Sequence, residues 1–272
     1  MKKVHLITID GQNDFCAFNT KQGALYVGTD ASGAEADVRR LARFVNKVGD
    51  RLAMIHSTLD SHHPQHIAHA IMWTNSKGEQ PPIFNPIFNA DLVSGKWFAH
   101  NPRLRAAFQN YTNELEKHNR YVLVIWPQHC IIGSWGHALY PELSDAFIDW
   151  QNKYHKRINY VAKGSNMLTE HYSAVQADVP DDADPTTKLN TQLIDLLAKN
   201  ADEILITGQA LSHCVANTIQ DIADNFGEDN IKKFTLLEDT CSNVPSFEKL
   251  GQDFVKTMTK RGMRTTTTDN WS

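Results

Sequence analysis

Short runs of apolar residues recur along the chain, and most of them are continuous rather than alternating. That pattern is typical of strands buried on both faces of a parallel sheet. Residues 4–10, for example, read VHLITID, and residues 203–209 read EILITGQ. The pattern predicts strands over residues 4–10, 51–60, 121–127, 158–164, 203–209 and 234–239.

Segments with helical spacing separate these strands. In the last of them Phe247, Leu250, Phe254 and Met258 recur every three or four positions and form one apolar stripe. The predicted helices cover residues 33–50, 101–118, 187–201, 213–226 and 246–262. Because strand and helix alternate, we expect a three-layer α/β/α fold with a mostly parallel central sheet. Ligands bind such sheets at the carboxyl ends of the strands.

Residues 61–100 show neither period and are rich in proline, asparagine and aromatic residues. An irregular segment of that length inside a compact domain tends to carry function. No linker, repeat or low-complexity stretch divides residues 1–272, which predicts a single domain. The TTTT stretch at 265–268 is expected to be a last short strand or a frayed tail.

The composition narrows the class of partner. With 27 basic and 31 acidic residues, the formal net charge is -4 with no long run of either sign, which argues against nucleic-acid and anionic-membrane binding. Polar residues follow the first apolar run too soon for a signal peptide or spanning helix, so a cytoplasmic location is expected. The 4 cysteines lie far apart without a CxxC pair, and each one taken alone is most simply a small buried apolar residue.

Polar side chains follow the predicted strands at the edge where a ligand would bind. The strands lead into Asp10, Asp60, Lys163 and Cys214, and the run ending at 127 leads into QHC. A free thiol has a pKa of about 8.5, so a reactive cysteine needs a base and a positive group or helix N-terminus nearby. Asp10 and Lys163 are candidates for these roles, although an acid there is often a helix cap and a lysine is often solvated.

A second group of residues could hold a metal ion. Asp60 and His62 are separated by one residue, so an extended segment can aim both side chains in one direction. His66 or the distant His129 could complete such a site together with water. A chance histidine pair is common in a chain with 13 of them, so spacing alone leaves the metal open. One carboxylate and two imidazoles suit zinc, iron or manganese.

Five short motifs contain the residues discussed above. They are DGQNDF at 10–15, DSHHPQH at 60–66, WPQHCIIGSWGHAL at 126–139, AKG at 162–164 and GQALSHCV at 208–215. These motifs resemble those of the isochorismatase-like cysteine hydrolases, and among them the nicotinamidases. Each motif alone is unspecific, but together they follow the order of the family. The resemblance implies the fold expected above.

The resemblance also implies roles for the residues at the matching positions. Asp10, Lys163 and Cys214 would form a catalytic triad. The backbone amides of Ala210 and Cys214 would form an oxyanion hole, beside a cis peptide bond between Gln209 and Ala210. A bond of that kind costs about 3 to 4 kcal/mol for a non-proline residue.

The metal implied by the resemblance is divalent, with zinc expected first and iron or manganese as alternatives. Its ligands would be Asp60, His62 and His129, with His66 either a further ligand or a close neighbour. Phe15 and Trp126 match the aromatic positions that flank the substrate ring, although each could also be an ordinary core residue.

The chain departs from the family pattern in three places. Ser134 stands where a threonine is usual, and Ser61 stands where an aromatic residue often follows the metal aspartate. A long insertion at about 67–120 adds aromatic residues near the expected pocket mouth, namely Trp73, Phe84, Phe88 and Trp97. The insertion bears on the identity of the substrate more than on the chemistry.

The expected activity is hydrolysis of nicotinamide to nicotinate and ammonia through a cysteine thioester, by a homo-oligomer of the kind usual in the family. One alternative is another cysteine amidohydrolase of this fold, acting on a carbamoyl, ureido or aromatic amide. A second alternative is a non-catalytic binding protein that kept the fold. An isochorismatase proper, which cleaves a vinyl ether without this cysteine, is disfavoured by Cys214.

Overall fold

The computed structural model describes residues 2–19, 21–117 and 121–272. Its centre is a six-stranded sheet whose neighbouring strands are all parallel, which confirms the predicted sheet. Across the sheet the strands are β10 (Arg264–Thr266), β9 (Phe234–Leu237), β8 (Glu203–Gly208), β1 (Val4–Ile9), β2 (Leu52–Asp60) and β7 (Asn159–Lys163). The TTTT stretch contributes to β10.

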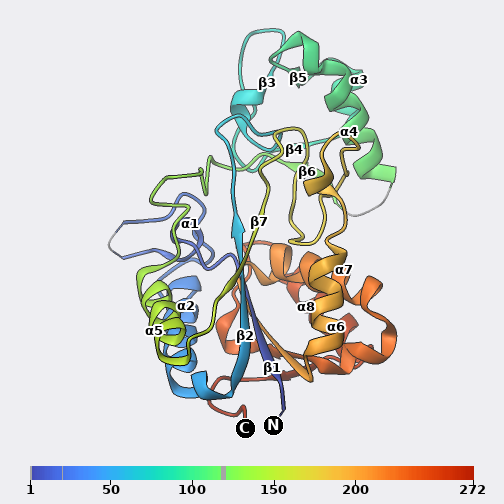
Figure 1. Ribbon diagram of the computed structural model, residues 1–272. Helices are drawn as coiled ribbons and strands as arrows, with labels where there is room; N and C mark the ends of the chain where they lie inside the picture. Colours follow the sequence, from blue (N-terminus) through green and yellow to red (C-terminus); the bar gives the residue numbers. More distant parts are fainter. Residues whose placement is uncertain (1, 20, 118–120) are drawn as a thin grey trace.

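Helices cover both faces of the sheet, as Figure 1 shows. The helices of one face are α2 (Ala34–Val48) and α5 (Pro141–Tyr154), and those of the other are α6 (Thr191–Asn200), α7 (Ala216–Phe226) and α8 (Glu248–Lys260). Along β8, Leu205 packs into the core on the α2 side, whereas Ile204 and Ile206 pack into the core on the α7 side. Burial on both faces explains the continuous apolar runs and confirms the three-layer fold. No described helix has the length and apolar character needed to cross a membrane.

Helix α5 is absent from the predicted set, although its sequence carries a helical pattern. Leu143, Phe147 and Trp150 recur at helical spacing and are buried, and Pro141 occupies the first helical position. The other long helices follow their predicted ranges to within a few residues. Residue 118, at the end of one predicted helix, lies outside the described residues.

The prediction of a strand of the central sheet over residues 121–127 is wrong. Only Leu123–Val124 forms a strand in this run (β6), and its antiparallel partner is β4 (Pro86–Ile87), outside the central sheet; Trp126 adds an isolated bridge to His69. Further along, the amide of Ile125 donates to the carbonyl of Asn85. The inserted region thus satisfies the backbone of this run, while β7 occupies the edge of β2 where a further strand would have paired.

The excursion after β2 contains short elements of its own. They are β3 (Trp73–Thr74), α3 (Asn89–Val93), β5 (Phe98–Ala99) and α4 (Arg105–Lys117). One further short helix, α1 (Asn13–Cys16), follows β1 and lies outside this excursion. Figure 1 shows β3, β5, α3 and α4 gathered beyond the end of the sheet to which β1 and β2 run. Trp73 is fully buried against Phe108 of α4, with ring centroids 4.7 Å apart. Residues 118–120, the last of the predicted insertion, lie outside the described residues.

The strand order reverses between β1 and β8. The chain runs outward from β1 through β2 to β7, and then returns to β8 on the other side of β1. Such a switch point opens a crevice at the carboxyl ends of the two strands. Gly208 ends β8 with φ +117°, and a Cβ there would lie 2.0 Å from the carbonyl oxygen of Ile9. The close approach of β1 and β8 therefore requires glycine at this position.

Candidate active site

The carboxyl ends of four central strands bring the predicted catalytic residues together. Asp10 follows β1, and Cys214 lies in the turn after β8. Asp60 ends β2 and is the register partner of Lys163, which ends β7. All four side chains are buried at the switch point between β1 and β8 or beside it.

Lys163 is the centre of this cluster. Its Nζ lies 3.0 Å from Asp10 Oδ2, 2.8 Å from Asp60 Oδ1 and 3.5 Å from Cys214 Sγ. Its side chain is only 1% exposed, so no solvent screens these contacts. One buried cation thus faces two carboxylates and a thiol.

Burial and charge set the resting protonation states. Burial raises the pKa of the Cys214 thiol well above its usual value, and Lys163 offsets this only in part. Burial also raises the pKa of Asp10, against the lowering effect of Lys163. For Lys163 burial acts to lower the pKa, but Asp10 and Asp60 raise it well above its usual value. Cys214 therefore rests as a thiol beside a charged lysine, and Asp10 is a carboxylate suited to accept a proton.

The carboxylate of Asp10 is fixed by its own backbone and by β2. Its amide donates to Thr58 Oγ1 at 3.0 Å, and that hydroxyl donates back to Asp10 Oδ1 at 2.5 Å. Asp10 also has a φ of 48°, in the left-handed region that aspartate tolerates better than most residues. The second carboxylate oxygen is left to face Lys163.

The turn that carries Cys214 is unusual in two ways. The peptide bond between Gln209 and Ala210 is cis, as the family resemblance implies. A π-helical turn over Leu211–Val215 then precedes α7. The carbonyl of Ala210 accepts hydrogen bonds from the amides of His213 at 3.0 Å and Val215 at 3.1 Å, and so passes over Cys214. Because of the π-turn, the Ala210 carbonyl does not accept a hydrogen bond from the amide of Cys214.

A second buried group adjoins the first through Asp60. The ligand atoms of Asp60, His62 and His129 all lie within 4.8 Å of one another, which suits a metal ion. Asp60 Oδ2 is 2.9 Å from His62 Nε2 and 3.2 Å from His129 Nε2. A carboxylate and two imidazoles are ligands of divalent transition metals and zinc.

Backbone carbonyls orient the imidazoles of this group. Nδ1 of His62 donates to the carbonyl of Gly164 at 3.0 Å, and Nδ1 of His129 donates to the carbonyl of Pro127 at 2.8 Å. Because a carbonyl only accepts, each Nδ1 carries the hydrogen, which leaves a lone pair on Nε2 for a metal. Hydrogen bonds of this kind commonly orient metal-binding histidines.

His69 has the same arrangement, although it was not among the predicted ligands. Its Nδ1 donates to the carbonyl of Pro64 at 3.0 Å, and its fully buried Nε2 has no hydrogen-bond partner among the described residues. Its ring centroid lies 5.5 Å from that of His62 and 5.8 Å from that of His129. The signal in the sequence is weak, since His69 is one more histidine in a segment already rich in them.

His66, which was predicted as a ligand or a close neighbour, makes different contacts from those of His69. Its Nε2 donates to the carbonyl of Thr169 at 3.1 Å, and its Nδ1 accepts from the amide of Ala68 at 3.3 Å. Its ring centroid is 4.3 Å from that of His62. Both ring nitrogens are thus engaged with the backbone, and the geometry makes His66 a neighbour of the candidate metal group.

A small cavity of about 30 Å³ joins the two groups, and the predicted aromatic residues line it. Phe15 packs edge-on against His129, with ring centroids 5.4 Å apart. Trp126 donates from Nε1 to the hydroxyl of Tyr172 at 2.7 Å. Other lining residues include Asp60, Lys163, Ala210, Cys214, Glu170, Tyr172 and His213. Sequence reasoning gave the last three no role in the site: Glu170 and Tyr172 lie outside the motifs, and His213 lies in the motif at 208–215 only as the residue beside the cysteine.

Comparisons with known proteins agree with the geometry. No family model matches the chain. A nicotinamidase of Saccharomyces cerevisiae is 28% identical over 164 residues, which are 53% of this chain and 70% of the yeast protein. A solved nicotinamidase from Acinetobacter baumanii matches with a TM-score of 0.63 and 21% identity, over 99% of this chain and 98% of that one. A pyrazinamidase from Pyrococcus horikoshii in complex with zinc matches with a TM-score of 0.56 and 18% identity, over 97% and 99% of the two chains.

The fold and the cluster of Asp10, Lys163 and Cys214 are those that the resemblance to the isochorismatase-like cysteine hydrolases implied. Within that class its similarity, in sequence and in fold, is to nicotinamidases. The resemblance inferred from the five motifs is thus confirmed in sequence and in fold.

Proposed function

We propose that the protein is a nicotinamidase, which hydrolyses nicotinamide to nicotinate and ammonia. The observation that carries this proposal is the position of Lys163, whose Nζ contacts Asp10, Cys214 and the metal-group carboxylate Asp60 at 3.5 Å or less. That contact joins a thiol with its base to a site that can hold the substrate ring. The similarity to the yeast nicotinamidase supports the choice of amide.

The reaction begins with proton transfer from Cys214 to Asp10. The thiolate attacks the amide carbon, and the charge of Lys163 stabilises the thiolate inside a site where solvent cannot. Asp10 then gives the proton to the departing nitrogen, and ammonia leaves a thioester on Sγ. A water molecule, deprotonated by Asp10, hydrolyses that thioester and releases the carboxylate and the free thiol.

The backbone at Ala210 and Cys214 provides the oxyanion hole. The π-turn directs the Ala210 carbonyl to His213 and Val215, which frees the Cys214 amide from that carbonyl for the oxyanion. Donors fixed in advance inside a dry cavity are worth more than donors in water, and one of them typically contributes about 3 to 4 kcal/mol.

Asp60, His62 and His129 would hold the divalent metal, and zinc suits their donor set. Bound there, the metal would supply a Lewis-acidic contact that orients the pyridine nitrogen of the substrate. Among the other histidines, we assign His69 rather than His66 as the further nitrogen available to the metal, because only its Nε2 is unpaired. Phe15 and Trp126 would enclose the pyridine ring from the walls of the cavity.

An ammonia-release assay tests this proposal. The protein, loaded with zinc, should release ammonia from nicotinamide and pyrazinamide, and Cys214→Ala should abolish that release. A panel of ureido and carbamoyl compounds serves as the comparison. Turnover of those compounds without turnover of any pyridine carboxamide would contradict the proposal and favour a different cysteine amidohydrolase.

A further inference from the structure

A groove of about 560 Å³ lies next to the catalytic cavity, and the reaction described above makes no use of it. Its volume falls in the range of roughly 300 to 1,000 Å³ that is usual for small-molecule sites. The catalytic cavity, at about 30 Å³, has room for about two water molecules rather than for an aromatic ring. A substrate ring must therefore displace side chains before it reaches Cys214.

Tyr172 and His213 line both spaces and form their common wall. The two rings meet edge to face, with centroids 5.4 Å apart. The His213 ring is held by a hydrogen bond between its Nδ1 and Ser212 Oγ at 2.8 Å. Because His213 lies in the common wall, a ligand passing from the groove to Cys214 would have to displace this ring and break that hydrogen bond.

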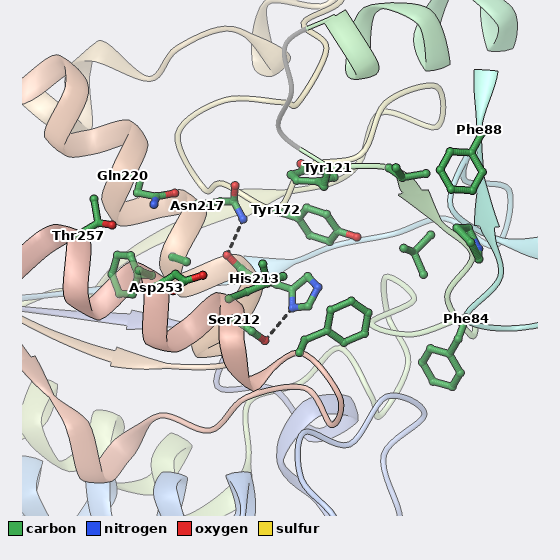
Figure 2. Close-up of a pocket in the computed structure, with 17 residues that line it drawn as sticks. Phe84, Phe88, Tyr121, Tyr172, Ser212, His213, Asn217, Gln220, Asp253 and Thr257 are labelled. Atoms are coloured by element: carbon green, nitrogen blue, oxygen red, sulfur yellow. Dashed lines mark hydrogen bonds between the residues drawn. The ribbon is translucent and has the colours of Figure 1, made fainter. Parts of the chain in front are cut away.

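Aromatic rings from separate parts of the chain supply much of the groove surface. The rings belong to Phe84, Phe88, Tyr121, Phe247 and Phe254. Figure 2 shows Phe84 and Phe88 at one end of the groove, Gln220 and Thr257 at the other, and Tyr172 and His213 between them. Flat apolar walls of this kind suit a planar aromatic ring.

The charge of the groove favours a neutral ligand. Among the described residues that line it, there is no lysine or arginine, and Asp253 is the single carboxylate. Burial lowers the pKa of His213 to about 4, so this imidazole is uncharged at neutral pH. Asn217 and Gln220 add neutral amides that can pair with a carboxamide. The groove therefore suits an uncharged amide better than the carboxylate that its hydrolysis produces.

We propose that this groove is an outer binding site for the neutral aromatic carboxamide, from which the substrate passes Tyr172 and His213 to reach Cys214. The inference rests on the proposed function and adds a second place where the same amide binds. It also gives a role to the insertion, since Phe84 and Phe88 are 54% and 43% exposed and belong to the groove wall. Large exposed apolar groups gathered in one place commonly mark a binding site.

A matched pair of tryptophan variants tests the outer site. Leu250 lines the groove at 48% exposure, and Ile148 is 49% exposed on α5, across the sheet. Leu250→Trp should lower kcat/KM for nicotinamide by at least about tenfold with kcat changed less than about twofold, because substrate binding is obstructed while the chemistry is intact. Ile148→Trp should leave both constants unchanged. Equal kcat/KM values for the two variants would overturn the proposal.

A charge variant tests the same site without filling it. Gln220→Lys adds a cation to the groove, so nicotinate should become a stronger inhibitor than it is of the wild-type enzyme. An unchanged inhibition constant for nicotinate would count against the outer site. Should Leu250→Trp fail to fold, as seen by its far-UV circular dichroism, this variant decides the question.

The two proposals fail in different ways. If the wild-type chain releases no ammonia from nicotinamide, the proposed function fails, and the groove is judged by equilibrium binding of nicotinamide to Cys214→Ala. If Cys214→Ala bound nicotinamide with the same affinity with and without the added Leu250→Trp substitution, the proposal of an outer site would be overturned. If Leu250→Trp instead alters the sedimentation of the protein and leaves nicotinamide binding intact, the apolar surface contacts a second copy of the chain and the proposal is wrong.

Discussion

Lys163 Nζ lies 2.8 Å from Asp60 Oδ1, where β7 pairs with the end of β2. The other oxygen of Asp60 faces the Nε2 atoms of His62 and His129. A single carboxylate therefore belongs both to the cationic centre of the triad and to the candidate metal group. A change at Asp60 should be measurable in both.

Asp60→Asn should weaken metal binding and make the thiol of Cys214 more acidic. The amide loses an anionic ligand, so zinc affinity should fall by at least about tenfold. The charge of Asp60 raises the pKa of Cys214, so its removal should shift the alkylation of Cys214 in metal-free protein to lower pH. Competition with a chelator and iodoacetamide labelling measure the two effects. His129→Ala is the control, with weaker zinc binding and an unshifted alkylation profile. If His129→Ala shifted the pH dependence of alkylation as much as Asp60→Asn does, the charge of Asp60 would not be the cause of the shift, and the prediction would be wrong.

Asp10→Asn should remove the base that activates Cys214. Loss of a general base typically costs about 10² to 10⁴ in rate, and kcat should fall by that factor with intact zinc binding. Thr58→Val removes the hydroxyl that donates to Asp10 Oδ1 and should cause a smaller loss. Steady-state kinetics of ammonia release measure kcat for each protein, which should fall in the order wild type, Thr58→Val, Asp10→Asn. A kcat for Asp10→Asn close to that of the wild type would require another base.

Substitution of two neighbouring histidines should separate a metal ligand from a structural residue. His69→Ala removes the unpaired Nε2 and should weaken zinc binding by about 10- to 100-fold, an effect typical of groups that support a metal site. His66→Ala removes hydrogen bonds to Thr169 and Ala68 and should mainly lower the melting temperature. The visible spectrum of the Co²⁺-substituted protein reports the ligand set directly. An unchanged spectrum in His69→Ala, with a changed one in His66→Ala, would reverse the assignment.

Two histidines buried in the central sheet should make the protein sensitive to acid. His5 on β1 and His56 on β2 lie with Nδ1 of the first and Nε2 of the second 3.1 Å apart, and burial lowers their pKa values to about 4 and about 3. In the unfolded chain the two imidazoles bind protons near pH 6.5, whereas in the folded protein they stay neutral to lower pH. Their contribution to the free energy of unfolding is therefore fully present above pH 6.5 and is lost as the pH falls toward 4. Each proton contributes about 1.4 kcal/mol per pH unit to the slope.

Urea unfolding between pH 5 and 8 measures this slope. The double variant His5→Asn with His56→Asn should show a shallower dependence, by up to two protons. His155→Asn changes an exposed residue with φ 51°, which asparagine tolerates, and should keep the wild-type slope. An unchanged slope in the double variant would mean that the two histidines do not report on folding.

The parallel sheet and the catalytic cluster could be predicted because both depend on local pattern. A continuous apolar run indicates a strand buried on two faces, and residues such as Asp10 and Lys163 then share one edge of the sheet. The run at 121–127 misled because its apolar pattern records burial and says nothing about the partner. Its residues Leu123, Ile125 and Trp126 are buried, but the run pairs with the insertion.

The choice between His66 and His69 could not be read from the sequence. Each lies a few residues after Asp60, and what separates them is which backbone carbonyl each ring nitrogen meets after folding. Tyr172 was missed for a related reason, because the segment after β7 has no periodicity and its position depends on tertiary contacts alone.

The π-turn at Leu211–Val215 links the rotation of α7 about its own axis to the position of the nucleophile Cys214. Each residue advances a helix by about 100°, so a one-residue deletion in this turn would rotate Cys214 away from Lys163 if the buried face of Ile219 and Ile222 kept its place on the sheet. If Cys214 instead kept its place, the apolar face of α7 would turn toward solvent. The length of this turn is therefore far less free to vary than its side chains, and we expect relatives that differ here to substitute residues without gaining or losing any.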